Sequence, residues 1–208
     1  MVDLKEPKLM LRDLSCEKLD EVHGSGYYDY LDDPGYTDNV TRAVARMILD
    51  RTLHRASVLD VGCGTGALAG ELHPSMSYFG IDASYNAIRK AIRTHGQFGK
   101  RQWNVSRIEN FCDLALRDCD KFDAIHFGNV LCCLIHPDAR LSFVERYVEK
   151  FRARFIVVSD LERLDSTPLK DWYDLLEGET FHLNIPDQPD SKQHRKVEIY
   201  RTRVKRDG

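Results

Sequence analysis

The sequence predicts an α/β fold, a doubly wound and mainly parallel sheet that ends in a C-terminal antiparallel hairpin. Three observations carry this prediction. Short apolar runs typical of buried strands alternate with helical runs, which favours parallel strands with helices on both faces of the sheet. A glycine-rich bend follows the first of these strands. Near the C-terminus, two β-type segments follow one another with no helix between them.

The elements follow in order along the chain. The first is a helix over 39–54, because Val40, Val44, Met47 and Ile48 fall on one face. Five strands are expected at 57–62, 77–82, 100–106, 122–128 and 154–160. Two amphipathic helices lie between strands and are marked by Ala87, Ile88, Ala91 and Ile92 and by Leu141, Val144, Val148 and Phe151. Pro137 suits the first turn of the second of these helices.

The C-terminal part breaks the alternation. A short helix is expected from Pro168 to Leu176, and two β-type segments near 179–185 and 195–204 flank the turn-rich IPDQPDSKQ. Together with the five strands above, this hairpin gives a seven-stranded sheet.

Composition limits the classes of function. The 208 residues are 42% hydrophobic and 30% charged, which is ordinary for a folded soluble domain. A net charge of -3 gives no global attraction to nucleic acid or anionic membranes, so a nucleic-acid substrate is possible but disfavoured. No signal peptide, membrane helix or metal-type spacing is visible, and the scattered cysteines are read as reduced thiols of a cytoplasmic protein.

The strongest local signal is the bend VLDVGCGTGAL, in which Gly62, Gly64 and Gly66 separate a buried strand from a helix. Glycines let the chain turn sharply and let a ligand lie against bare backbone. A phosphate-binding loop needs Lys-Ser/Thr after the last glycine, but Ala67 follows here. A nicotinamide or flavin site expects G-x-G-x-x-G, which is not the spacing found. A tight turn without a ligand stays an alternative for the bend taken alone.

A second motif supports a ligand. The strand SYFGID ends in Asp82, and a carboxylate at that strand tip can accept hydrogen bonds from both ribose hydroxyls of an adenosine-containing ligand. The alternative for Asp82 is a solvent-facing residue that precedes a helix capped by Ser84.

With both motifs in place, LDVGCGTGALAGEL and FGIDAS resemble the class I S-adenosylmethionine-dependent methyltransferases, and the resemblance extends from about residue 40 to 204. It implies a Rossmann-like fold with S-adenosyl-L-methionine as cofactor. It also implies an N-terminal lid segment, 1–38, before a catalytic domain, 39–208. The terminal hairpin matches the antiparallel seventh strand of the family.

The resemblance implies a set of cofactor contacts. The glycine loop would lie along the methionine part, Asp60 would orient the loop and the amino-acid end, and Asp82 would hold the ribose. Lid tyrosines would face the sulfonium through cation–π contacts. The full set is Asp60, Gly62, Cys63, Gly64, Gly66, Asp82, Ala83, Arg107, Ile108, Gly128, Tyr28 and Tyr36.

The sequence also departs from the family. Many relatives place an acidic residue after the third strand to receive the adenine amino group, whereas Arg107 stands here. Backbone groups and the apolar Ile108 are the expected substitutes. The fourth-strand motif reads FDAIHFGNVLCCL, with cysteines where relatives often carry histidines, so no histidine base is assumed at those two positions.

Methyl transfer from a sulfonium depends mainly on alignment and exclusion of water, and it needs a base only when the acceptor must lose a proton. The catalytic candidates therefore come from location. Asn129 could orient the acceptor at the tip of the fourth strand. His126 lies within that strand and is more simply a packed core histidine. His136 is either near the site or a capping residue, and Ser159 and Asp160 end the fifth strand near the expected acceptor.

These observations predict a cytoplasmic methyltransferase, a monomer or homodimer, acting on an O or N atom of a small molecule. The basic C-terminal run RKVEIYRTRVKR leaves an RNA or protein methyltransferase as an alternative, although such runs are more often solvated faces. A catalytically idle partner subunit that binds the cofactor is a third reading.

Overall fold

A computed structural model describes residues 18, 21, 34–97, 99–113, 121–131, 135–161, 164, 166–185 and 188–203, with only the backbone described at 34–37, 161, 184–185 and 188–193. Seven strands form one sheet in the order β3-β2-β1-β4-β5-β7-β6. They are β1 (Ser57–Val61), β2 (Ser77–Asp82), β3 (Arg101–Val105), β4 (Ala124–Gly128), β5 (Phe155–Leu161), β6 (Asp174–Ile185) and β7 (Gln188–Arg201). The first five strands run parallel and β7 is antiparallel to both neighbours. The predicted fold class is confirmed.

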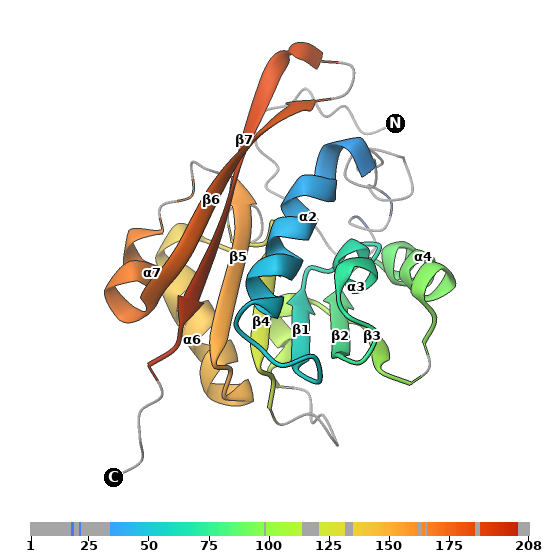
Figure 1. The fold of residues 1–208 in the computed structure, drawn as a ribbon, viewed down its shortest axis with the longest axis horizontal. Helices are drawn as coiled ribbons and strands as arrows, with labels where there is room; N and C mark the ends of the chain where they lie inside the picture. The colour runs from blue at the N-terminus through green and yellow to red at the C-terminus, as the bar shows by residue number, and fades with distance from the viewer. Residues whose placement is uncertain are drawn as a thin grey trace.

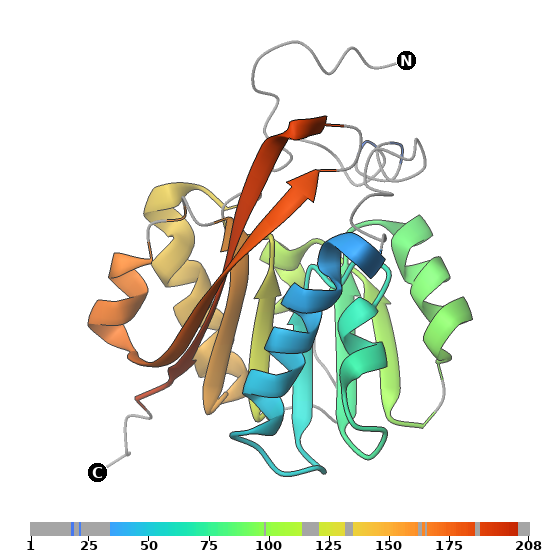
Figure 2. The ribbon, with the colours of Figure 1, turned by 45° about the horizontal axis from the view of Figure 1, so that its top comes forward.

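Helices cover both faces of the sheet, as Figures 1 and 2 show. They are α2 (Pro34–Leu49), α3 (Ala67–Glu71), α4 (Tyr85–His95), α5 (Ile108–Phe111), α6 (Arg140–Phe151) and α7 (Thr167–Trp172), with a 3₁₀ turn η3 at Pro137–Ala139. One core cluster joins the sheet to α2, α3 and α4, and a second joins it to α5, α6 and α7. The alternation of strand side chains explains this division, because neighbouring residues such as Val58 and Leu59 enter opposite clusters.

Several boundaries differ from the prediction. Helix α2 begins at Pro34 and ends at Leu49, so the boundary expected between 38 and 39 falls inside it. Helix α7 is shorter than expected, and β6 begins at Asp174, within the predicted helix. The hairpin strands are longer than expected, because pairing continues through His182 and His194 into the predicted turn. A register shift after Asn184 absorbs the extra residues, as a β-bulge does.

The long hairpin rises beyond the carboxyl ends of the parallel strands, on the same side as the start of α2 (Figures 1 and 2). The order of strands reverses between β1 and β4. In open α/β sheets, ligands bind outside the carboxyl ends of the strands at such a point. The topology therefore places the candidate site between the glycine loop and the end of β4. No helix among the described residues is long and apolar enough to cross a membrane.

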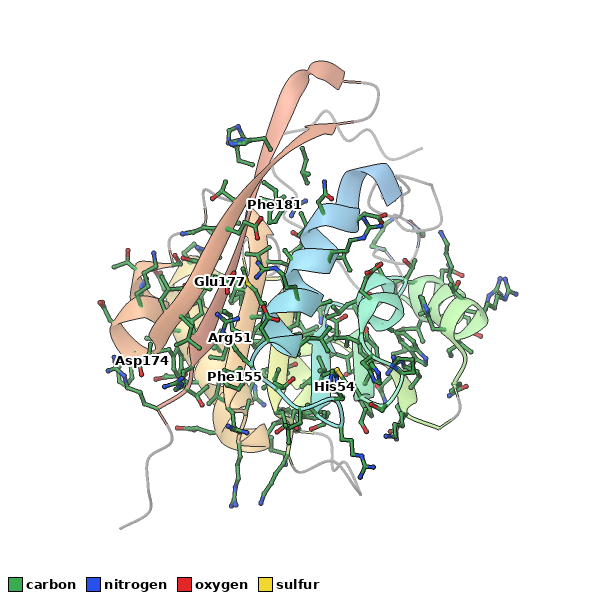
Figure 3. The ribbon with its side chains drawn as sticks, in the orientation of Figure 1. Arg51, His54, Phe155, Asp174, Glu177 and Phe181 are labelled. Carbon is green, nitrogen blue, oxygen red and sulfur yellow. The ribbon has the colours of Figure 1, made fainter. Side chains whose placement is uncertain are left out.

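An ion-pair cluster ties α2 to the edge strand. The Glu177 carboxylate lies 2.8 Å from Arg46 Nη2 and 2.6 Å from Arg51 Nη2, and Figure 3 labels Arg51 beside Glu177. Hydrogen bonds from Arg46 and Arg51 lower the pKa of the Glu177 carboxyl from its ordinary value of 4.5. Because these side chains are partly exposed, the cluster contributes only about 0.5–1 kcal/mol.

Replacement of Glu177 by glutamine is therefore expected to lower the unfolding free energy by about 0.5–1 kcal/mol at pH 7. Because the pKa of Glu177 is lower in the folded protein, the ionised carboxylate stabilises the fold in full at pH values above the ordinary pKa. This stabilisation is lost as the pH falls through the folded pKa. The difference between wild type and Glu177→Gln should thus vanish below that pKa. Thermal melts at pH 7 and at successively lower pH values below 4.5 check this, with exposed Glu149→Gln as control. A pH-independent difference would contradict the assignment.

Candidate active site

The glycine loop connects β1 to α3, and all three of its glycines have positive φ: 75° at Gly62, 52° at Gly64 and 82° at Gly66. A Cβ on Gly62 would lie 2.3 Å from Val130 Cγ1, and one on Gly66 would lie 2.4 Å from Trp103 Cη2. A Cβ on Gly64 would meet no atom within 4 Å. Two of the glycines therefore allow close packing, while the third borders open space where a ligand can approach the backbone.

Asp82 is bound directly to this loop. Its Oδ2 accepts a hydrogen bond from Gly64 N–H at 2.9 Å, and its Oδ1 accepts one from Ser84 N–H at 2.9 Å. Ser84 in turn caps α4, because its hydroxyl accepts from Ala87 N–H. A carboxylate can accept about four hydrogen bonds, so holding the loop is compatible with binding ligand hydroxyls as well. The structure thus brings together the two motifs that the sequence analysis paired, with Ala83 beside them.

Cys63 lies within the loop and is buried. Burial, and then the carboxylates of Asp82 and Asp60, raise the pKa of the Cys63 thiol well above its ordinary value. The thiol therefore stays protonated and is no nucleophile. Among the described cysteines, Cys63 and Cys112 are both buried free thiols.

Asn129 follows β4 and has an unusual backbone conformation, with φ 56°. Its N–H donates to Ser159 O at 2.9 Å, which fixes the loop against the end of β5. Its side-chain Oδ1 is buried, and no donor among the described residues lies within hydrogen-bonding distance. A buried acceptor without a partner is costly, so this atom is suited to a donor supplied by a ligand. Gly128 precedes it at the end of β4, paired with Ser159.

The two histidine candidates have different surroundings. His126 is buried, with Nδ1 2.7 Å from Asp60 Oδ1 and Nε2 2.7 Å from Ser159 Oγ. Both of its ring nitrogens are therefore bound by protein groups. His136 is exposed, and its Nδ1 caps the 3₁₀ turn by accepting from Asp138 N–H. It takes the capping position that the sequence analysis had kept as an alternative.

Asp60 lies beneath the glycine loop and not at its surface. It is 2% exposed, and its Oδ2 accepts from the Tyr78 hydroxyl at 2.6 Å. On the adenine side, Arg107 is the N-cap residue of α5, and the Ile108 side chain is buried in the core. The Ile108 carbonyl oxygen accepts a hydrogen bond from the Tyr147 hydroxyl, and the contact of Ile108 with adenine stays a prediction. Tyr28 lies outside the described residues, and of Tyr36 only the backbone, within α2, is described.

Sequence reasoning missed three residues that shape this site. Trp103 of β3 packs against Gly66 and Gly80, Val130 packs against Gly62, and Tyr78 holds Asp60. For Tyr78 and Trp103 the sequence held one signal, the alternation of side chains between the two faces of a strand. This alternation directs both side chains into the same core cluster. Ser159 and Asp160 are buried at the end of β5, and Asp160 Oδ2 accepts from Leu131 N–H at 3.1 Å.

Comparison with known protein families shows to which family the chain belongs. A family model described as a methyltransferase domain matches residues 30–192. The chain belongs to the class I S-adenosylmethionine-dependent methyltransferases. No curated protein matched the sequence. Membership of this family agrees with the strand order, the glycine loop and the acidic residue at the end of β2.

Solved structures with this fold include methyltransferases of several kinds. The N-methyltransferase NodS from Bradyrhizobium japonicum, in complex with S-adenosyl-L-homocysteine, has a TM-score of 0.65 and 16% identity over 83% of this chain and 90% of that chain. Magnesium protoporphyrin IX methyltransferase from Synechocystis, with the same compound bound, has a TM-score of 0.67 and 14% identity over 90% and 99%. A putative RNA methyltransferase from Pyrococcus horikoshii has a TM-score of 0.59 and 14% identity over 78% and 81%. At these identities, the likeness concerns the fold of the methyltransferase.

Proposed function

We propose that this methyltransferase transfers a methyl group from S-adenosyl-L-methionine to an O or N atom of a small-molecule acceptor. The proposal is carried by three groups that lie at the carboxyl ends of the parallel strands β1, β2 and β4. These are the open backbone at Gly64, the Asp82 carboxylate bound to that backbone, and the buried Asn129 Oδ1. Together they offer an acceptor for ribose hydroxyls, a bare surface for the amino-acid part, and an acceptor for a further N–H or O–H donor.

The acceptor class is proposed from charge and from the neighbours. Two basic side chains of the C-terminal run already have acidic partners, since Lys196 pairs with Glu198 and Arg203 pairs with Asp174. Arg195 of the same run is buried and not part of a solvated face. Such side chains are poorly placed to follow a nucleic-acid backbone. Two of the solved neighbours are named as an N-methyltransferase and a porphyrin methyltransferase, which also favours a small acceptor here.

When bound, S-adenosylmethionine supplies an electrophilic methyl carbon whose leaving group is a neutral thioether. The protein's own contribution is then mainly to align the acceptor and to exclude water. The Asp82 carboxylate and the glycine loop fix the donor side. Asn129 accepts a hydrogen bond from the methyl acceptor and so sets the orientation of that molecule beside Gly128. His136 is exposed, and we propose no proton transfer to it.

The role of Asn129 predicts an unusual combination of effects. Asn129→Gly keeps the left-handed backbone and removes the buried acceptor, so we expect unchanged or slightly higher stability. Because the ligand loses its partner, kcat/KM should fall by about tenfold. Asn129→Asp keeps the acceptor oxygen and serves as the comparison, measured by melting temperature and steady-state kinetics. An unchanged kcat/KM in Asn129→Gly would remove Asn129 from the site.

Radiolabelled methyl donor, incubated with separated metabolite, RNA and protein fractions, tests the acceptor class. Label in the metabolite fraction is expected. Label in RNA or protein would replace the small-molecule proposal with the corresponding macromolecular one. Binding of S-adenosylhomocysteine without label in any fraction would favour a cofactor-binding partner subunit.

A further inference from the structure

A chain of four buried side chains crosses the sheet beneath the candidate site. It runs from Tyr78 on β2 to Asp60 on β1, His126 on β4 and Ser159 on β5, and we call it the relay. The Tyr78 hydroxyl is 2.6 Å from Asp60 Oδ2, and His126 is 2.7 Å from both Asp60 Oδ1 and Ser159 Oγ. Asp60 and His126 stand directly opposite each other on paired strands. All four side chains are buried, so water competes little with these bonds.

One arrangement of hydrogens satisfies every member of the relay. Burial, and then the Asp60 carboxylate, raise the pKa of Tyr78 well above its ordinary value, so its hydroxyl donates to Asp60. With a proton on Nδ1, His126 donates to Asp60 and accepts from the Ser159 hydroxyl through Nε2. This arrangement leaves no ring nitrogen of His126 directed toward a methyl acceptor.

Two members of the relay, Asp60 and Ser159, reach different parts of the site. Asp60 precedes the glycine loop on β1, and the Gly62 and Cys63 N–H groups of this loop donate to Ile81 O. On β5, Ser159 O accepts from Asn129 N–H, and the adjacent Asp160 accepts from Leu131 N–H.

The His126 ring also packs under the tip of β4. A Cβ at Gly128 would lie 2.9 Å from His126 Cε1. The ring therefore fills the space that a side chain at position 128 would need.

We propose that His126 is a positioning residue that couples the glycine loop to the loop carrying Asn129, and that it is not the proton acceptor of the reaction. This inference rests on the proposed function, because the coupling is read out as cofactor affinity. The proposal predicts that a substitution of Ser159, on β5, changes the affinity for the cofactor at the glycine loop. Among the described residues, no hydrogen bond joins the Ser159 side chain directly to this loop.

The test measures the dissociation constant of S-adenosylhomocysteine by calorimetry well below the melting temperature. Ser159→Ala is expected to raise this constant about threefold to tenfold, as the loss of one buried hydrogen bond does. Asparagine at position 126 can still donate to Asp60 but is too short to reach Ser159. In a His126→Asn background, Ser159→Ala should therefore have no further effect.

The control is Thr202→Val, which removes a matched buried hydroxyl bonded to Ala153 O at the opposite end of the sheet. This variant should lower the melting temperature and leave the dissociation constant unchanged. If His126→Asn does not fold, His126→Leu replaces it as the background with the same non-additivity expected, because leucine also has no group that can bond to Ser159.

Three results would overturn the coupling. Ser159→Ala could lower the melting temperature alone, as the control does. Its effect on affinity could persist in full in the second background. His126→Asn could keep cofactor affinity and lose more than about 100-fold in turnover, which is the behaviour of a missing general base. Failure of the wild type to bind S-adenosylhomocysteine would instead refute the proposed function.

Discussion

Replacing Asp82 by asparagine is expected to weaken binding of S-adenosylhomocysteine by about 1–3 kcal/mol, or about 5–150-fold in the dissociation constant. The carboxylate accepts from Gly64 N–H and Ser84 N–H, one with each oxygen. An asparagine would turn one of these oxygens into an NH₂ group that faces a backbone donor. The loop would lose an anchor and the ribose would lose a charged acceptor in the same substitution.

Calorimetry with the purified variant measures this loss. Asp174→Asn is the matched control, because Asp174 is an exposed aspartate paired with Arg203 at the edge strand. Its dissociation constant should equal that of the wild type. Equal affinity in Asp82→Asn and Asp174→Asn would remove Asp82 from the cofactor site.

The second large effect is expected at the glycine loop, where packing and ligand binding can be separated. Gly66→Ala would place a Cβ 2.4 Å from Trp103 Cη2 at a φ of 82°. Backbone strain and overpacking together should cost about 2–5 kcal/mol of unfolding free energy. In Gly64→Ala the added Cβ would meet no atom within 4 Å. Only the backbone strain of a left-handed alanine, at a φ of 52°, then lowers the unfolding free energy, by about 1–2 kcal/mol. Its Cβ would nevertheless fill the surface on which the ligand lies, and binding should weaken at least about tenfold.

Gly96 provides the control for Gly64. It has a φ of 77° with nothing within 4 Å of an added Cβ, and it ends α4 outside the glycine loop. Gly96→Ala should cost at least as much stability as Gly64→Ala, because its ψ of 170° lies in a region essentially confined to glycine, and it should leave cofactor affinity unchanged. Denaturant titration and calorimetry on the three variants separate the two effects. If Gly64→Ala binds the cofactor as Gly96→Ala does, the ligand does not lie against position 64.

The sequence predicted the parallel part of the fold well because local and tertiary signals agree there. The expected strand at 77–82 matches β2 at both ends, and β1, β3, β4 and β5 differ from prediction by two residues or fewer at either end. Apolar runs, the glycine loop and Ser84 as a helix cap all act locally. The hairpin was predicted with the right strand order along the chain but the wrong length. Strand β7 begins at Gln188 because this residue and Lys192 pair with β6 across a register shift, and such cross-strand pairing is not described by sequence propensity.

The candidate site was predicted in part for the same reason. The pairing of Asp82 with the glycine loop follows from two adjacent parallel strands, which the motifs fix. The surroundings of His126 do not follow from its own sequence, because its partners Asp60 and Ser159 come from strands far away in the chain. Likewise, the differing tasks of Gly62, Gly64 and Gly66 depend on Val130 and Trp103, which no spacing rule connects to the loop.

A crystal structure with S-adenosylhomocysteine tests the central claim most directly. We expect the adenosine hydroxyls within hydrogen-bonding distance of the Asp82 carboxylate, with the amino-acid part lying along Gly62–Gly66. A compound bound at another place, with the surface at Gly64 exposed to solvent, would contradict the account.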